Sequence, residues 1–189
     1  MTEIVELPDG RLASYQVAGK GIPALMFPGS TAAACMRQHN ALFPYVLRSY
    51  LIDLPCAGHP ARHLAVRQAS LYELARRSLG LGRVIVFGHS SGSAAALAYA
   101  ATYRQHTAAC VIVAPDVQAC PLLRRISCRT LVVAGELDLS YGPAQARPIA
   151  GEIPGSEFVA LPDCGRLPAM ESPDGYRQVV LDFLRGPLC

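Results

Sequence analysis

Short runs of apolar residues alternate along this chain with longer segments in which apolar residues recur every three or four positions. The short runs are rich in Val, Ile and Leu and have the length of buried strands, whereas the longer segments have the period of helices. This alternation predicts an α/β fold, with a mostly parallel twisted sheet of about eight strands and helices on both of its faces.

The apolar runs predict strands at residues 4–7, 12–17, 24–27, 49–53, 83–87, 109–114, 130–134 and 157–161. The first two are expected to form a hairpin, because Pro8, Asp9 and Gly10 between them are typical of a tight turn. The segments of helical period predict helices at residues 32–46, 71–81, 91–103, 141–149 and 173–184.

The chain has 189 residues, of which 51% are hydrophobic, and this size predicts a single domain over residues 1–189. Its net charge is only +3 and its basic residues are scattered, so we expect no nucleic-acid partner. No apolar run reaches the roughly 18 residues that cross a membrane, and the first residues are acidic, unlike a signal peptide. We therefore expect a cytoplasmic protein without a membrane partner.

Seven cysteines are an odd number, have no zinc-like spacing and lie mostly in or beside apolar segments. Such cysteines are typical of buried thiols in a reducing compartment, so we expect neither a metal nor a cofactor. Lys20 is the only lysine among 17 basic residues, which is typical of a GC-rich bacterial genome.

The pentapeptide Gly88-His89-Ser90-Ser91-Gly92 lies between a predicted strand and an Ala-rich predicted helix. A Gly-x-Ser-x-Gly sequence in this position is typical of a nucleophile elbow, a sharp turn that leaves no room for Cβ atoms beside the serine. We expect Ser90 to be an exposed nucleophile at the start of the helix. The backbone N–H of Ser91 is then placed to stabilise an oxyanion.

Further motifs in the correct order resemble the α/β-hydrolase superfamily over nearly the whole chain. These are Phe27-Pro28-Gly29-Ser30 after the third strand, Asp53-Leu54-Pro55 with Gly58-His59 after the fourth, and Gly135-Glu136-Leu137-Asp138 after the seventh. The resemblance implies Ser90 as nucleophile, Asp138 as the triad acid, and the N–H groups of Ser30 and Ser91 as the oxyanion hole. Thr31 is an alternative to Ser30, because it is equally close in sequence. The alternative for Asp138 is a cap for the helix entering at Tyr141.

The last motif departs from the family pattern. Relatives usually read Gly-His-x-Pro, whereas this chain reads Gly165-Arg166-Leu167-Pro168, followed by Glu171-Ser172-Pro173. Imidazole titrates near neutrality and suits a proton shuttle, but guanidinium stays charged and only donates hydrogen bonds. Arg166 therefore cannot be the general base. Two roles remain open for it: binding a substrate carboxylate, or pairing with Asp138.

A substitute base is needed if Ser90 is to attack a substrate. His59 is the candidate, because its loop follows a strand that ends at the same edge of the sheet as the elbow. The alternative role for His59 is to stabilise its own turn. His89 is expected to point away from Ser90, since neighbouring side chains diverge at such a turn.

The segment between the sixth and seventh predicted strands is too short for the cap domain that many relatives insert there. The helix before the elbow is also expected to be short, so the predicted domain is a trimmed one without a cap. Such a site is either open or covered by a partner subunit. Apolar surface left by the missing cap predicts a homodimer.

Three functions follow from these residues. The first is a serine hydrolase that acts on a small acyl, ester or thioester substrate through Ser90, with an atypical triad. The second is a cyclase, isomerase or lyase in which Arg166 and the oxyanion donors polarise a carbonyl. The third is a catalytically silent fold kept for binding. Substrate identity depends on pocket-lining residues that these motifs do not specify.

Overall fold

The computed structural model describes residues 2–29, 33–53, 61–117 and 122–187. Its described residues form an eight-stranded sheet in the order β1-β2-β4-β3-β5-β6-β7-β8. The strands are β1 (Thr2–Glu6), β2 (Leu12–Gly19), β3 (Ile22–Phe27), β4 (Leu47–Asp53), β5 (Val84–His89), β6 (Thr107–Val113), β7 (Arg129–Gly135) and β8 (Glu157–Leu161). β2 is antiparallel to both β1 and β4, and the other neighbours are parallel. The predicted fold class is confirmed.

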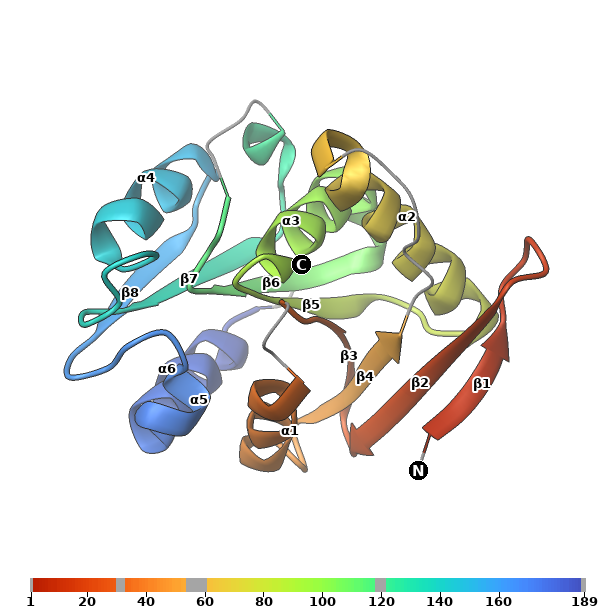
Figure 1. Cartoon of the computed structure of the whole chain (residues 1–189), viewed down its shortest axis with the longest axis horizontal. Coiled ribbons are helices and arrows are strands. Elements are labelled where there is room, and N and C mark those ends of the chain that lie inside the picture. The colour runs from red at the N-terminus through yellow and green to blue at the C-terminus, as the bar shows by residue number, and fades with distance from the viewer. Residues whose placement is uncertain (1, 30–32, 54–60, 118–121, 188–189) are drawn as a thin grey trace.

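Helices cover both faces of the sheet (Figure 1). One face carries α2 (Ala61–Ser78), α3 (Gly92–Thr102) and α4 (Pro143–Glu152), and the other carries α1 (Ala33–Leu42), α5 (Pro168–Glu171) and α6 (Pro173–Arg185). None of the helices in the described ranges combines the length and the apolar character needed to cross a membrane.

The central strands are apolar on both sides because each side faces a layer of helices. In β5, Val84 and Val86 belong to the core under α2, α3 and α4, whereas Ile85 and Phe87 belong to the core above α1 and α6. This division follows from the two-residue period of a strand. Helix α3 is rich in alanine and almost entirely buried, so it fits closely between the sheet and α2.

The β1–β2 hairpin forms as predicted, with Gly10 at a φ of 81° in its turn. The helix before the elbow, however, is not short, and that prediction was wrong. Helix α2 has 18 residues and begins at Ala61, because Ala65, Ala69 and Tyr72 continue its buried face toward the N-terminus. The connection from β6 to β7 spans residues 114–128, which is too short a segment for a cap domain.

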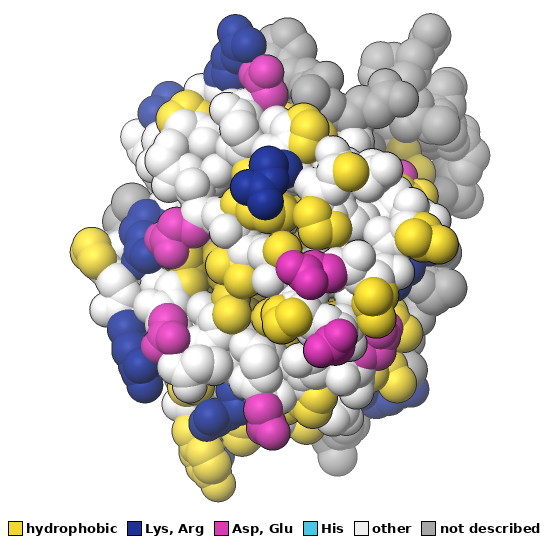
Figure 2. Space-filling view, turned by 90° about the vertical axis from the view of Figure 1, so that its left-hand side faces the viewer, with side chains coloured by type: hydrophobic (Ala, Val, Ile, Leu, Met, Phe, Trp, Pro, Cys, Tyr) yellow, Lys and Arg dark blue, Asp and Glu magenta, His cyan; other side chains and the backbone are white. Residues whose placement is uncertain are grey.

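Charged side chains of both signs are mixed on the face beside β8, and hydrophobic side chains gather near its middle (Figure 2). Arg124 pairs there with Glu152 at 2.7 Å, and Arg129 pairs with Glu157 at 2.5 Å. The Arg124 side chain is largely exposed, and an exposed pair of this kind contributes little to stability, about 0 to 1 kcal/mol. This face therefore has no extended patch of one charge.

The loops that follow β7 and β8 touch through their backbones. A Cβ atom at Gly135, the last residue of β7, would overlap the carbonyl oxygens of Cys164 and Gly165. The Leu137 N–H also donates to the Cys164 carbonyl at 2.8 Å. The loop carrying Arg166 can thus lie against the loop carrying Asp138 only because residue 135 is glycine.

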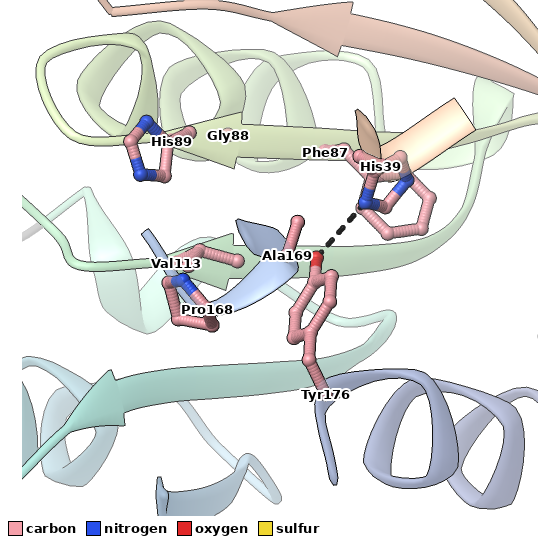
Figure 3. A pocket seen from close by; sticks show the side chains of 8 residues that line it. All are labelled: His39, Phe87, Gly88, His89, Val113, Pro168, Ala169 and Tyr176. Atoms are coloured by element: carbon pink, nitrogen blue, oxygen red, sulfur yellow. Dashed lines mark hydrogen bonds between the residues drawn. The ribbon is translucent and has the colours of Figure 1, made fainter. Parts of the chain in front are cut away.

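A buried histidine ties α1 to α6. His39 is 2% exposed, and its ring packs against Phe43, Phe87 and Tyr176. Its Nδ1 lies 3.0 Å from the Tyr176 hydroxyl. A dashed line marks this hydrogen bond in Figure 3. Burial lowers the pKa of His39 to about 3, so the ring is neutral at physiological pH.

We predict that Gly135→Ala destabilises the protein by about 2 to 3 kcal/mol, because the new methyl group displaces backbone atoms that cannot move independently. The matched control is Gly151→Ala in α4, where a Cβ meets no atom within 4 Å. The control should change stability by no more than about 1 kcal/mol, in the stabilising direction. Urea unfolding curves measure both, and equal small effects would contradict the close approach.

We also predict that His39 makes stability depend on pH in acid. Its pKa is about 3 when folded and about 6.5 when unfolded, so the unfolded state binds the proton first as pH falls. This contribution is complete above about pH 6.5 and is lost as pH falls toward 3. When the pH falls from 7 to 4.5, the free energy of unfolding of the parent protein should fall by about 2 to 3 kcal/mol more than that of His39→Gln. Parallel pH dependences in urea unfolding would refute this assignment.

Candidate active site

Ser90 lies in the sharp turn between β5 and α3 and adopts a φ of 51°, in the left-handed region. Its backbone N–H donates to the Val113 carbonyl at 3.0 Å. Its own carbonyl accepts from the N–H groups of Ser93 at 2.9 Å and Asp116 at 3.3 Å. These bonds hold a conformation that costs on the order of 1–3 kcal/mol for a residue with a side chain. The predicted elbow is therefore present.

The two motif glycines are needed for close approach. A Cβ at Gly88 would lie 2.8 Å from the Cα of Ser93, and a Cβ at Gly92 would overlap the carbonyl oxygen of Phe27. Both positions thus bring α3 against the ends of β3 and β5. Ser90 itself is only 6% exposed, so the expectation of an exposed serine was wrong. The Arg166 side chain, from the loop after β8, lies against it.

The segment after β3 lies beside the elbow, as the oxyanion-hole assignment requires. A Cβ at Gly29 would lie 3.1 Å from the Ser90 Cβ and 3.2 Å from the Ser91 Oγ. Ser91 is exposed and precedes the first residue of α3. Ser30 and His59 lie outside the described residues, so their assigned roles stay predictions.

Arg166 reaches the nucleophile position directly. Its Nη2 donates a hydrogen bond to the Ser90 Oγ at 3.1 Å, and its Cζ lies 4.2 Å from the centre of the Tyr141 ring. The guanidinium thus occupies the place where the family motif has imidazole. Because the hydroxyl oxygen accepts this bond, the hydroxyl proton is directed elsewhere, and Arg166 cannot take it.

The backbone around Arg166 is held from three directions. One Glu171 carboxylate oxygen accepts from the Gly165 N–H at 2.6 Å, and the other accepts from the Leu167 N–H at 2.8 Å. The Arg166 carbonyl accepts from the His89 Nε2 at 3.0 Å. The position of this arginine is therefore fixed by the fold and does not depend on its contact with Ser90.

His89 is a neutral supporting residue. A carbonyl oxygen only accepts, so the His89 Nε2 carries the proton. Burial lowers its pKa, and its Nδ1 is buried without a hydrogen-bond partner among the described residues. The ring borders a cavity of about 10 Å³ between β5 and the start of α5, which has room for about one water (Figure 3). As predicted, His89 makes no hydrogen bond to Ser90 within the described structure.

Asp138 lies in the loop after β7, as the acid of a triad would. Its Oδ1 accepts from the N–H groups of Ser140 at 2.9 Å and Tyr141 at 3.0 Å. Its Oδ2 is buried and has no hydrogen-bond partner in the described part of the chain. Helix α4 starts later, with Gly142 as its N-cap, so Asp138 caps the preceding turn and not the helix.

The alternative in which Arg166 pairs with Asp138 is not what the structure shows. Within the described ranges, no carboxylate lies within 4.0 Å of the Arg166 guanidinium nitrogens, and its Nε is buried without a partner. Among the described residues, the Arg166 Nε and the Asp138 Oδ2 thus have no hydrogen-bond partner, and both belong to the loops around the strained Ser90.

Sequence reasoning missed two supporting residues. Glu171 belongs to the quoted Glu-x-Pro motif, but only the fold shows that it brackets Arg166. Tyr141 lies under the guanidinium, and its only sequence signal was its place just after the acid loop.

Burial raises the pKa of the Cys164 thiol to about 11, which makes it a poor nucleophile. The described residues include no cluster of His, Cys, Asp and Glu suited to a metal ion.

Comparisons with known proteins agree on the fold. A family model described as the alpha/beta hydrolase fold matches residues 27–125, slightly more than half of the chain. No curated protein gives a significant sequence match.

Among solved structures, a thermophilic esterase from Thermogutta terrifontis, determined with malate bound, is 19% identical with a TM-score of 0.83, covering 98% of both chains. The serine hydrolase CarC of carbazole degradation is 17% identical with a TM-score of 0.84, again covering 98% of both. The carboxylesterase CesB from Bacillus subtilis is 16% identical with a TM-score of 0.81, covering 100% of this chain and 92% of its own. The protein thus belongs to the α/β-hydrolase fold family.

Proposed function

We propose that this protein is an enzyme of the serine-hydrolase type, in which Ser90 attacks the carbonyl of a small acyl, ester or thioester substrate. The observation that carries the proposal is the strained Ser90 turn, because strain of this kind is typically kept where a side chain must be presented for chemistry. Two of the structural neighbours are an esterase and a carboxylesterase, and they support this reaction class in general terms.

Arg166 would act electrostatically. A guanidinium 3.1 Å from the hydroxyl favours negative charge on Ser90 and on the tetrahedral intermediate. The backbone N–H groups of Ser30 and Ser91 would hold the carbonyl oxygen as it becomes negative. This arrangement replaces the proton shuttle of a complete triad with fixed positive charge.

The covalent steps balance without a cofactor. In the first, a bond forms between the Ser90 Oγ and the acyl carbon, the bond to the leaving alcohol or thiol breaks, and the serine proton ends on that leaving group. In the second, the oxygen of a water molecule bonds to the acyl carbon, and the bond from that carbon to the Ser90 Oγ breaks. A proton from the water restores the serine hydroxyl, and the acyl group leaves as the carboxylic acid. The intermediate carrier of the proton is His59 or solvent hydroxide, because Arg166 cannot accept it.

One observation favours a second function, in which the carbonyl is polarised without covalent attack. Ser90 accepts the Arg166 hydrogen bond, so its own O–H remains available to donate to a substrate oxygen alongside the guanidinium. Two donors at one point suit a cyclase, isomerase or lyase step that builds up charge on a carbonyl oxygen.

Covalent labelling separates these two functions. If Ser90 is a nucleophile, incubation with an activated fluorophosphonate should add one probe mass to the intact protein, and peptide mapping should place it on Ser90. Ser90→Ala is the control and should remain unlabelled. Unmodified parent protein at high probe concentration would exclude the covalent function in favour of carbonyl polarisation.

Restoring imidazole tests whether the remaining triad geometry is intact. We predict that Arg166→His raises the hydrolysis of p-nitrophenyl acetate about 100-fold, because a ring at this position can join the Ser90 Oγ to the orphaned Oδ2 of Asp138. Its rate should rise with an apparent pKa between about 6 and 7. Arg166→Gln removes the charge without adding a base and should show no such rise. A folded Arg166→His protein without any gain would show that Asp138 and Ser90 are not aligned.

A further inference from the structure

No carboxylate of the described residues pairs with the Arg166 guanidinium, although a shielded arginine normally has an anionic partner. It is only partly exposed, its Nη2 bonds to the Ser90 hydroxyl, and Tyr141 covers one face. Its Nε is buried and has no partner among the described residues. A cation held in this way is costly unless a negative group completes it.

Other shielded arginines in the chain are completed by glutamates. Arg76 is buried and pairs with Glu73 at 2.8 Å, and the half-buried Arg129 pairs with Glu157 at 2.5 Å. The fold thus supplies a carboxylate at these two arginines. At Arg166 it supplies a hydroxyl and an aromatic ring, while Glu171 binds the adjacent backbone N–H groups and leaves the guanidinium alone.

We propose that the missing anion is a carboxylate of the substrate, so that this site selects short acyl esters or thioesters whose acyl group carries a second, free carboxylate. The inference rests on the proposed function for its reaction, but the carboxylate site itself needs only Arg166. Arginine suits this ligand because its guanidinium donors lie in one plane and can bind both oxygens of a carboxylate.

The distances limit the length of the acyl group. A carboxylate oxygen lies about 3 Å from a guanidinium nitrogen that binds it, and a reacting carbonyl carbon lies about 3 Å from the nucleophile. The Nη2 and the Ser90 Oγ are themselves 3.1 Å apart. Even laid end to end, these contacts keep the two carbonyl carbons of the substrate within about 10 Å of each other, a limit that a short diacid such as succinate meets.

Binding of such a substrate also frees the nucleophile. The hydrogen bond from the Arg166 Nη2 occupies a lone pair of the Ser90 oxygen that is needed for attack. A carboxylate competes for the same guanidinium donors and binds them more strongly than a neutral hydroxyl does. The Asp138 carboxylate opposes an incoming anion only in part, because two backbone N–H groups already bind its Oδ1.

The first experiment measures binding alone. Thermal unfolding of the full chain is followed with succinate and with uncharged succinamide at equal ionic strength. Succinate at about ten times its Kd should raise Tm by about 3 °C or more, and succinamide should not. The shift should vanish in Arg166→Gln and persist in Arg77→Gln, which removes an exposed arginine from the last turn of α2. Equal shifts in the two variants would overturn the proposal.

The second experiment measures selectivity with p-nitrophenyl hemisuccinate and p-nitrophenyl butyrate. The parent protein should show a kcat/KM about 10- to 100-fold higher for the hemisuccinate, because a charge-assisted bond contributes that much. Arg166→Gln should lose this preference, and Arg77→Gln should keep it. Hydrolysis of both esters at equal rates would overturn the carboxylate site and leave the proposed function standing. Succinate binding through Arg166 without turnover of either ester would support the carboxylate site and contradict the proposed function.

Discussion

The left-handed turn at Ser90 is the constraint on which the site depends. A residue with a side chain is strained there, and it stays there because β6 supplies a backbone acceptor at Val113 and α3 begins immediately afterward. The motif glycines let the helix and the end of β3 approach closely enough to hold the turn. The serine hydroxyl is thus presented by backbone hydrogen bonds and close packing, independently of whichever side chain stands opposite it.

The side chain that stands opposite is an arginine, and this changes the chemistry available without changing the frame. Imidazole would both accept and return a proton, whereas guanidinium provides a fixed charge and donors in one plane. The loop that presents it is still built in detail, with Glu171 bracketing the residue and His89 holding its carbonyl. The backbone at this position is therefore held firmly. The Oδ2 of Asp138 is buried without a hydrogen-bond partner in the described part of the chain.

Behind the elbow lie two buried histidines, His39 and His89, which are neutral. His39 is enclosed by aromatic rings and His89 donates to a carbonyl, and burial lowers the pKa of both. Neither ring adds charge beside Ser90, and among the described side chains Arg166 is the cation in contact with the hydroxyl. A site with one dominant cation and a carboxylate already bound by backbone N–H groups is suited to an anionic ligand.

The sequence by itself determined the fold class and the succession of strands along the chain, because strand periodicity is a local signal. It also determined that Ser90, Asp138 and Arg166 lie in turns that follow strands, because turn glycines are local signals as well. It did not determine the full length of α2, whose first turns carry apolar residues interrupted by arginines. Only the tertiary structure decided that Arg166 contacts Ser90 and not Asp138. It also decided that Glu171 holds the backbone on both sides of Arg166. Those outcomes depend on how two loops pack across Gly135, and a contact between segments distant in sequence leaves no periodic trace in either one.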